Sequence, residues 1–225
     1  MKFSLLVPRK PDHGTRDYHW SLIKRRYQRL MPQVEICTGF DKSKLFCKSR
    51  ALNKAALKAT GDIFIICDAD VIFAPDLVRK IASIIDLHPW IIPFKKAFFL
   101  TKNTTNRLIK RGLPPKFRIK EEDIERSFFG KGQLMNVVKR ECFEAVHGFD
   151  ERFKGWGLED FAFRLSLDTI CGKHFNMDEE IYHLWHPRAK RDHRHAGKNK
   201  QLYNQYLEAA ENVDDMQKII NGRFK

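Results

Sequence analysis

Short apolar runs alternate with amphipathic segments along the first part of the chain. Residues Lys2–Val7 and Ile63–Cys67 are mainly apolar, which is the pattern of strands buried in a parallel sheet. Residues 17–30 and 49–60 carry apolar side chains at helical spacing, and 76–85 follows a proline as a third helix. This alternation predicts an α/β fold with a central, mostly parallel sheet flanked by helices.

The pattern changes after residue 94. The stretch from Lys95 to Lys120 contains nine Lys and Arg residues and no acidic residue, and it is rich in Asn, Thr, Gly and Pro, which favour loops. We interpret it as a basic insertion loop, either solvated or placed over an anionic ligand. The chain is predicted to form a single domain with four parts: a first half (1–94), the basic insertion loop (95–127), a second half (128–197) and a closing C-terminal helix (198–225).

The net charge and the cysteine content indicate the class of binding partner and the cellular compartment. The 225 residues carry a net charge of +14, which predicts an anionic partner such as a nucleotide phosphate, a nucleic acid or an anionic membrane surface. Five cysteines form no C-x-x-C pair, and we expect them to be reduced in a cytoplasmic protein. We find neither a signal peptide nor an apolar stretch long enough for a transmembrane segment.

The strand Ile63–Cys67 ends at two carboxylates, Asp68 and Asp70. The carboxyl ends of strands are where open α/β sheets bind their ligands. Two acids at the end of a buried strand are costly unless a cation lies beside them. The pair is therefore a candidate site for a divalent metal and the diphosphate that the metal carries. The alternative is that both acids only solvate the end of the strand.

Two further groups of residues have the chemistry to complete such a site. Glu159 and Asp160 begin a helix after the turn Gly155-Trp156-Gly157, and either they interact only with the helix dipole or one acts as a general base. Trp156 would then offer an aromatic platform for a sugar ring or a base. His183 and His186 are either core residues or metal ligands. The basic segment 188–200 that follows could neutralise a diphosphate.

Taken together, these stretches resemble the GT-A fold glycosyltransferases, most closely the β-1,4-galactosyltransferases and the family 2 type of bacterial and phage sugar transferases. The resemblance runs over two blocks, 46–70, which ends in D-x-D, and 136–160, which ends in G-W-G-x-E-D. It implies that residues 1–94 bind a nucleotide-sugar, with a UDP-sugar as the first choice, and that 128–197 hold the acceptor and catalytic groups. It also implies a Mn²⁺ or Mg²⁺ cofactor.

The resemblance further implies a role for individual residues. Asp160 matches the catalytic base that deprotonates the acceptor hydroxyl in inverting members, and Asp70 matches the metal ligand. His183 aligns best with the family's metal-binding histidine, with His186 and Asp68 as further possible ligands. Acceptor contacts are expected from Trp156, Gly157 and Glu159, and donor contacts from Pro8, Arg9, Arg50, Asn53, Asp68 and Lys131. Leu158 replaces a glycine that is frequent in the family, so the acceptor pocket is expected to differ.

These residues predict a metal-dependent, inverting glycosyltransferase that acts on a glycan or a lipid-linked saccharide, with its basic surface against anionic lipid. The first alternative keeps this chemistry but transfers the sugar to a hydroxymethylated base in DNA, because the two basic stretches suit a nucleic acid. The second alternative is a non-catalytic, basic nucleic-acid or polysaccharide binder on the same scaffold. The presence of Asp68, Asp70, Asp160 and His183 argues against that last reading.

Overall fold

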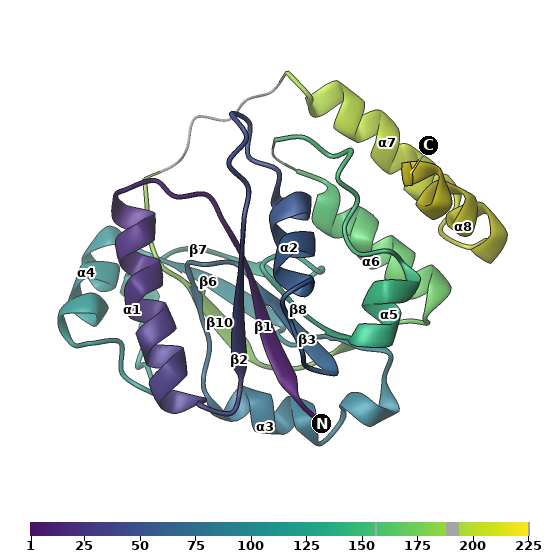
Figure 1. The fold of residues 1–225 in the computed structure, drawn as a ribbon. Helices are drawn as coiled ribbons and strands as arrows, with labels where there is room; N and C mark the ends of the chain where they lie inside the picture. The colour runs from purple at the N-terminus through teal and green to yellow at the C-terminus, as the bar shows by residue number, and fades with distance from the viewer. Residues whose placement is uncertain (156, 188–193, 225) are drawn as a thin grey trace.

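The central sheet has six strands in the order β2-β1-β3-β8-β5-β9 (Figure 1). The computed structural model describes residues 1–155, 157–187 and 194–224. The strands are β1 (Phe3–Arg9), β2 (Glu35–Phe40), β3 (Ile63–Cys67), β5 (Trp90–Ile92), β8 (Met135–Lys139) and β9 (Phe175–Asn176). β1 is parallel to β2 and β3, and β5 is parallel to β9, whereas β8 runs antiparallel to both β3 and β5. The predicted α/β fold is confirmed, as a mixed sheet with three parallel pairings out of five.

Helices connect the parallel strands and cover the sheet. The first two are α1 (Thr15–Leu30) and α2 (Lys48–Ala56), and α2 packs against β1 and β2. Gly39 in β2 permits this packing, because a Cβ atom there would lie 1.8 Å from the backbone oxygen of Ala51. The predicted helix 49–60 therefore lies in the right place but ends earlier. The other helices on this sheet are α3 (Asp76–Ala82), the 3-10 helix η1 (Ile85–Leu87), α5 (Arg140–Ala145) and α6 (Glu159–Ile170).

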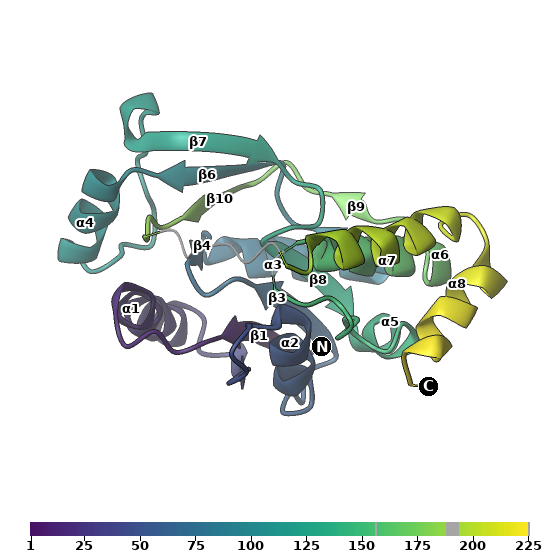
Figure 2. The same ribbon diagram turned by 90° about the horizontal axis from the view of Figure 1, so that it is seen from above.

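A second sheet of four strands, in the order β4-β10-β6-β7, lies beside the first (Figure 2). Its strands are β4 (Val71–Ile72), β6 (Lys96–Leu100), β7 (Ile124–Phe129) and β10 (Glu180–His183). β4 begins directly after Asp70, so the chain passes from the central sheet into the second sheet at the two carboxylates. This second sheet had no counterpart in the sequence analysis.

The prediction of a basic insertion loop over 95–127 was wrong. The segment forms β6, the helix α4 (Lys102–Lys110), the 3-10 helix η2 (Glu121–Asp123) and most of β7. The Thr residues that suggested a loop instead start α4: the Thr101 hydroxyl accepts a hydrogen bond from the Thr104 backbone N–H at 3.2 Å. Buried Asp123 then accepts hydrogen bonds from the Thr104 hydroxyl at 2.7 Å and from Arg107 at 2.6 Å. The polar composition of the segment predicted a loop because these contacts join residues that are not neighbours in the sequence.

The C-terminal part also differs from its prediction. Residues 198–225 were expected to form one helix, but the described residues form α7 (Ala196–Glu208), α8 (Val213–Asn221) and the 3-10 helix η3 (Gly222–Phe224). Asn212 separates α7 from α8 because its side chain caps α8, accepting a hydrogen bond from the Asp215 N–H at 3.1 Å. Both α7 and α8 pack against α6. Among the described helices, we find none with the length and apolarity needed to cross a membrane.

Candidate active site

The two carboxylates at the end of β3 are held in a turn between the two sheets. The Asp68 N–H donates a hydrogen bond to the carbonyl oxygen of Leu134, which precedes β8, at 2.9 Å. The carbonyl oxygen of Asp70 accepts one from the Leu184 N–H, just after β10, at 2.8 Å. The backbone on either side of the D-x-D motif is thereby fixed to different strands. The two side chains consequently meet different partners.

Asp70 lies between two histidines. β10 runs antiparallel to β4 with His183 opposite Val71, which brings the His183 ring to the carboxylate. The distance is 3.2 Å from His183 Nε2 to Asp70 Oδ1 and 3.1 Å from His186 Nε2 to Asp70 Oδ2. One possible ligand atom from each of the three residues lies within 4.8 Å of the others. The structure thus brings together the predicted metal ligand, Asp70, and both candidate histidines.

The His183 ring is fixed by stacking. The Phe99 ring of β6 lies 4.3 Å from the His183 ring, centroid to centroid, at an interplanar angle of 21°. The guanidinium of Arg126, on β7, lies 4.1 Å from the centroid of the Phe99 ring. His183 Nδ1 is buried and has no hydrogen-bond partner among the described residues. Ring orientation therefore rests on packing from the second sheet. Nε2 is the nitrogen that faces Asp70.

The electrostatics of this group couple the carboxylate to the two imidazoles. Burial raises the pKa of Asp70, but His183 and His186 outweigh it and hold that pKa well below its usual value. Burial lowers the pKa of His183, while Asp70 outweighs burial and raises it. The carboxylate is thus ionised beside two imidazoles, with ligand atoms close to the spacing that one transition-metal ion requires. This donor set fits a divalent cation.

Asp68 has a different partner, Lys48, which the sequence analysis missed as a site residue. The Lys48 Nζ lies 3.0 Å from Asp68 Oδ1 and 2.9 Å from Asp160 Oδ2, and all three side chains are largely buried. Burial lowers the pKa of Lys48, but Asp160 and Asp68 outweigh burial and raise it well above its usual value. One sequence signal existed: a lysine in the first turn of a helix opposes the helix dipole, so it needs acidic partners from elsewhere.

Glu159 and Asp160 form the first turn of α6. Leu158, which caps the helix, has a φ of 75° and turns the chain so that both acids lie on the buried side. Burial and the neighbouring Asp160 charge raise the pKa of Glu159 to about 7. Burial also raises the pKa of Asp160, although Lys48 opposes that effect. Lys48 therefore links Asp68 at the end of β3 to Asp160 in the first turn of α6 through one ammonium group.

The turn before α6 is held by two distant segments. Gly155 forms a parallel β-bridge with Cys47, which precedes α2. Buried Asn199 of α7 receives a hydrogen bond from the Lys154 N–H at 3.2 Å and donates to the Lys154 carbonyl at 3.0 Å and the Gly157 carbonyl at 3.4 Å. Asn199 was not predicted. Trp156 and residues 188–193 of the predicted basic segment lie outside the described residues.

The predicted donor-side residues separate into two groups. Pro8 and Arg9 end β1, where Arg9 is buried, pairs with Asp17 and lies 5.8 Å from the Trp20 ring. Lys131 is exposed in the segment between β7 and β8 that also contains Leu134, the partner of Asp68.

Arg50 and Asn53 are engaged elsewhere. Arg50 pairs with Glu151 at 3.0 Å and with Asp41 at 3.3 Å. The Asn53 amide donates to Phe149 and Glu151, and its carbonyl oxygen accepts from the Phe149 N–H at 2.9 Å. Both residues join α2 to the 149–151 segment, and the structure does not bring them to the D-x-D carboxylates.

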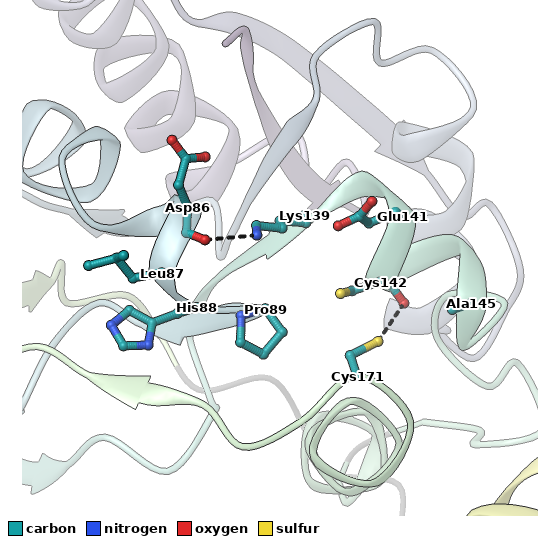
Figure 3. Close-up of a pocket in the computed structure, with 9 residues that line it drawn as sticks. All are labelled: Asp86, Leu87, His88, Pro89, Lys139, Glu141, Cys142, Ala145 and Cys171. Atoms are coloured by element: carbon teal, nitrogen blue, oxygen red, sulfur yellow. Dashed lines mark hydrogen bonds between the residues drawn. The ribbon is translucent and has the colours of Figure 1, made fainter.

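Arg16 is a further cation that sequence reasoning missed. It lies on α1, and its guanidinium lies 3.1–3.3 Å from the ring nitrogens of His186. A positive charge thus stands beside the candidate metal ligands. In contrast, the hollow of about 500 Å³ in Figure 3 lies outside this group, since none of the residues that line it is a site residue named above.

Comparison with known proteins identifies the family. Residues 33–210 match the family model "Glycosyltransferase like family 2", which covers more than half of the chain. The chain belongs to this family. It is therefore a nucleotide-sugar glycosyltransferase, which confirms the enzyme class and the family resemblance predicted from the two motif blocks. No curated protein matches the sequence.

Solved structures share the fold at low sequence identity. A mutant of Drosophila β1,4-galactosyltransferase 7 in complex with manganese, UDP-Gal and xylobiose has a TM-score of 0.52 at 16% identity, covering 88% of this chain and 79% of that one. The M. tuberculosis glucosyl-3-phosphoglycerate synthase with Mn²⁺, UDP-glucose and phosphoglyceric acid has a TM-score of 0.52 at 14% identity, covering 94% and 80%. S. aureus TarS with UDP-GlcNAc has a TM-score of 0.57 at 11% identity, covering 100% and 72%. These similarities confirm the GT-A fold.

The raised pKa of Glu159 predicts a pH-dependent penalty on stability. Because that pKa is about 7 in the folded protein and 4.5 is its ordinary value, the folded state holds more protons between these pH values. The Glu159 contribution to the free energy of unfolding therefore falls as pH rises from about 4.5 to about 7. In metal-free protein, Glu159→Gln should gain stability over wild type across this range, by at most about 3 kcal/mol.

Urea denaturation at a series of pH values in the presence of EDTA measures this difference. Glu208→Gln, at an exposed position of α7, is the matched control and should show no such trend. A Glu159→Gln difference that stays constant with pH would contradict the assignment.

Proposed function

We propose that this protein transfers a hexosyl group from a UDP-sugar to an acceptor hydroxyl, with a divalent metal and with inversion at the anomeric carbon. The observation that carries the proposal is the separation of roles around the D-x-D turn. Asp70 faces His183 and His186 on one side, whereas Asp68 shares Lys48 with Asp160 on the other. The group proposed to bind the metal and the carboxylate proposed as the base therefore lie on opposite sides of the D-x-D turn.

On the donor side, Asp70, His183 and His186 are the residues proposed to hold the cation. Two imidazoles favour Mn²⁺ over Mg²⁺, because Mg²⁺ prefers oxygen ligands and retains its waters. The bound cation supplies Lewis-acid stabilisation of the diphosphate leaving group. Arg16 supports this placement, since its charge beside His186 suits a phosphate oxygen. The related structures with bound UDP-sugars make a UDP-sugar the first choice of donor.

On the acceptor side, Asp160 is proposed to be the general base. It accepts the proton of the acceptor hydroxyl while the hydroxyl oxygen forms a bond to the anomeric carbon and the bond to the diphosphate breaks. A single displacement with one base inverts that carbon. Lys48 has two functions here: it lowers the pKa of the buried carboxylate and fixes its position relative to Asp68. Glu159 and Gly157 remain the proposed acceptor contacts, together with Trp156.

The second candidate function, sugar transfer to a nucleic acid, rests on the exposed cations of α4 and of the segment that follows it. The membership of a glycosyltransferase family removes the support for a purely non-catalytic binder. Contact with an anionic membrane stays a prediction. All five cysteines are free thiols, which supports the predicted cytoplasmic location.

The metal assignment predicts a large effect of Asp70→Asn. Removing the charged ligand between two histidines should weaken Mn²⁺ binding by at least about 100-fold, the upper range of effects seen around metal sites. Titration of Mn²⁺ followed by electron paramagnetic resonance measures the affinity. Asp86→Asn, at an exposed position, is the matched control. Equal affinity in Asp70→Asn and wild type would refute this ligand set.

The base assignment predicts that Asp160→Asn keeps donor binding but loses turnover. An amide cannot accept the proton, so kcat should fall by roughly 10²–10⁴, the usual contribution of a general base. The affinity for UDP in the presence of Mn²⁺ should change less than about twofold, because the donor group is unaltered. Steady-state kinetics and calorimetry separate the two effects. Full turnover in Asp160→Asn would mean that another group is the base.

The role proposed for Lys48 predicts that its replacement shifts the pH profile of kcat/KM. Replacing it by methionine removes the ammonium group that lowers the Asp160 pKa, so the acidic limb of kcat/KM should move to higher pH. Lys54→Met on the exposed side of the same helix is the control and should leave the profile unchanged. Circular dichroism verifies that both variants are folded. Identical acidic limbs in Lys48→Met and wild type would contradict the role given to Lys48.

A further inference from the structure

One end of the molecule carries a group of cations that the proposed sugar transfer does not use. The helix α4 and the segment after it carry seven Lys and Arg residues between 102 and 120 and no acid. Figures 1 and 2 place α4 next to α1, at the end of the molecule opposite α8. We define the α4 basic surface by six exposed residues: Asn103, Asn106, Lys110, Arg111, Lys116 and Arg118.

The surface is ordered by contacts with the core. Buried Arg26 of α1 donates hydrogen bonds to the carbonyl oxygens of Pro114 at 3.3 Å and Pro115 at 3.1 Å, and its guanidinium lies 5.2 Å from the Phe117 ring. The segment that carries Lys116 and Arg118 is therefore held against α1. On α4, the polar residues 103, 106, 107, 110 and 111 line one hollow of about 450 Å³.

The cations of this surface are not neutralised within the protein. Arg107 pairs with Asp123 at 2.6 Å, and Lys120 pairs with Glu122 at 3.5 Å. Lys110, Arg111 and Lys116 have no carboxylate partner within residues 1–155, 157–187 and 194–224. Their charges therefore remain available to an external anion.

The surface begins beside the candidate active site. The Trp185 N–H donates a hydrogen bond to the Thr105 hydroxyl at 2.9 Å, and Lys102 Nζ lies 5.2 Å from the centre of the Trp185 ring. Trp185 directly precedes His186, one of the proposed metal ligands. A polyanion lying along α4 would thus extend from the site of sugar transfer.

We propose that the α4 basic surface binds the phosphate backbone of duplex DNA. Apart from Pro115, the exposed residues from 102 to 120 include no apolar side chain, whereas a helix that binds a membrane buries an apolar face in it. The surface also presents no exposed aromatic side chain, and such side chains are the usual platforms for single strands.

Two features of α4 favour duplex DNA over duplex RNA as the ligand. Asn103 and Asn106 lie on the same stripe as the cations, and side-chain amides hydrogen-bond to adenine edges in the major groove. The major groove of B-DNA is about 12 Å wide and admits a helix. The major groove of duplex RNA is too deep and narrow for side chains to reach the bases. DNA that carries a hydroxymethylated base would supply the acceptor hydroxyl of the transfer, a step that rests on the second candidate function.

Fluorescence anisotropy with a labelled 20-base-pair duplex, at several salt concentrations, tests the surface. Lys110→Gln/Lys116→Gln should bind about 10-fold or more weakly at 100 mM salt and should reduce the salt slope by about 2. The matched control Lys54→Gln/Lys173→Gln removes the same charge from exposed positions outside α4 and should bind within about twofold of wild type. Circular dichroism checks the fold of both variants.

Equal weakening in the two double variants would overturn the proposal, because binding would then follow net charge alone. Unchanged binding in Lys110→Gln/Lys116→Gln would also overturn it. Vesicles with 30% phosphatidylserine should not displace the duplex, and displacement that depends on Lys110 and Lys116 would make the surface a membrane site. Asp160→Asn should bind the duplex like wild type, so a failure of the catalytic assignment is distinguishable from a failure of this surface.

Discussion

The structure of the active site depends on one constraint: three largely buried carboxylates, Asp68, Asp70 and Asp160, lie near the end of β3 and each has to meet a basic side chain. Asp70 meets two imidazoles, whereas Asp68 and Asp160 share one ammonium group. Burying an unpaired charge is prohibitively costly, so the surrounding elements must deliver these partners. Lys48 comes from the first turn of α2 and His183 from the last position of β10. The position of both elements is therefore tied to the chemistry of the site.

The second sheet has a clear role under this constraint. β4 is only two residues long, yet its pairing with β10 places His183 against Asp70. β6 then pairs with β10 and places Phe99 against the His183 ring, and β7 pairs with β6 and adds Arg126. The segment that looked like a solvated loop thus supports a proposed metal ligand. The same segment carries the α4 basic surface, so it connects the candidate site with the surface that we propose to bind DNA.

Glu159, Asp160 and Lys48 show why burial matters for the proposed reaction. A carboxylate in water would be too weak a base to remove a proton from a hydroxyl group efficiently. Burial raises the pKa of Asp160, and Lys48 opposes that rise. The same lysine contacts Asp68, so it joins the end of β3 to the start of α6. Gly155 pairs with Cys47 and the Gly157 carbonyl accepts a hydrogen bond from Asn199, so the residues on both sides of position 156 are held just before α6.

The sequence by itself determined the strands β1 and β3 and the helices α1, α2 and α3, because their apolar spacing is a local property. It also predicted the D-x-D turn, the acids at 159 and 160 and the two histidines, since these residue types have few structural reasons to end buried elements. Only the tertiary structure decided that Lys48 joins Asp68 to Asp160, that Arg50 and Asn53 face the 149–151 segment, and that residues 95–127 form β6, α4 and β7. These facts depend on pairings between residues far apart in the chain, which leave no periodic signal in local sequence.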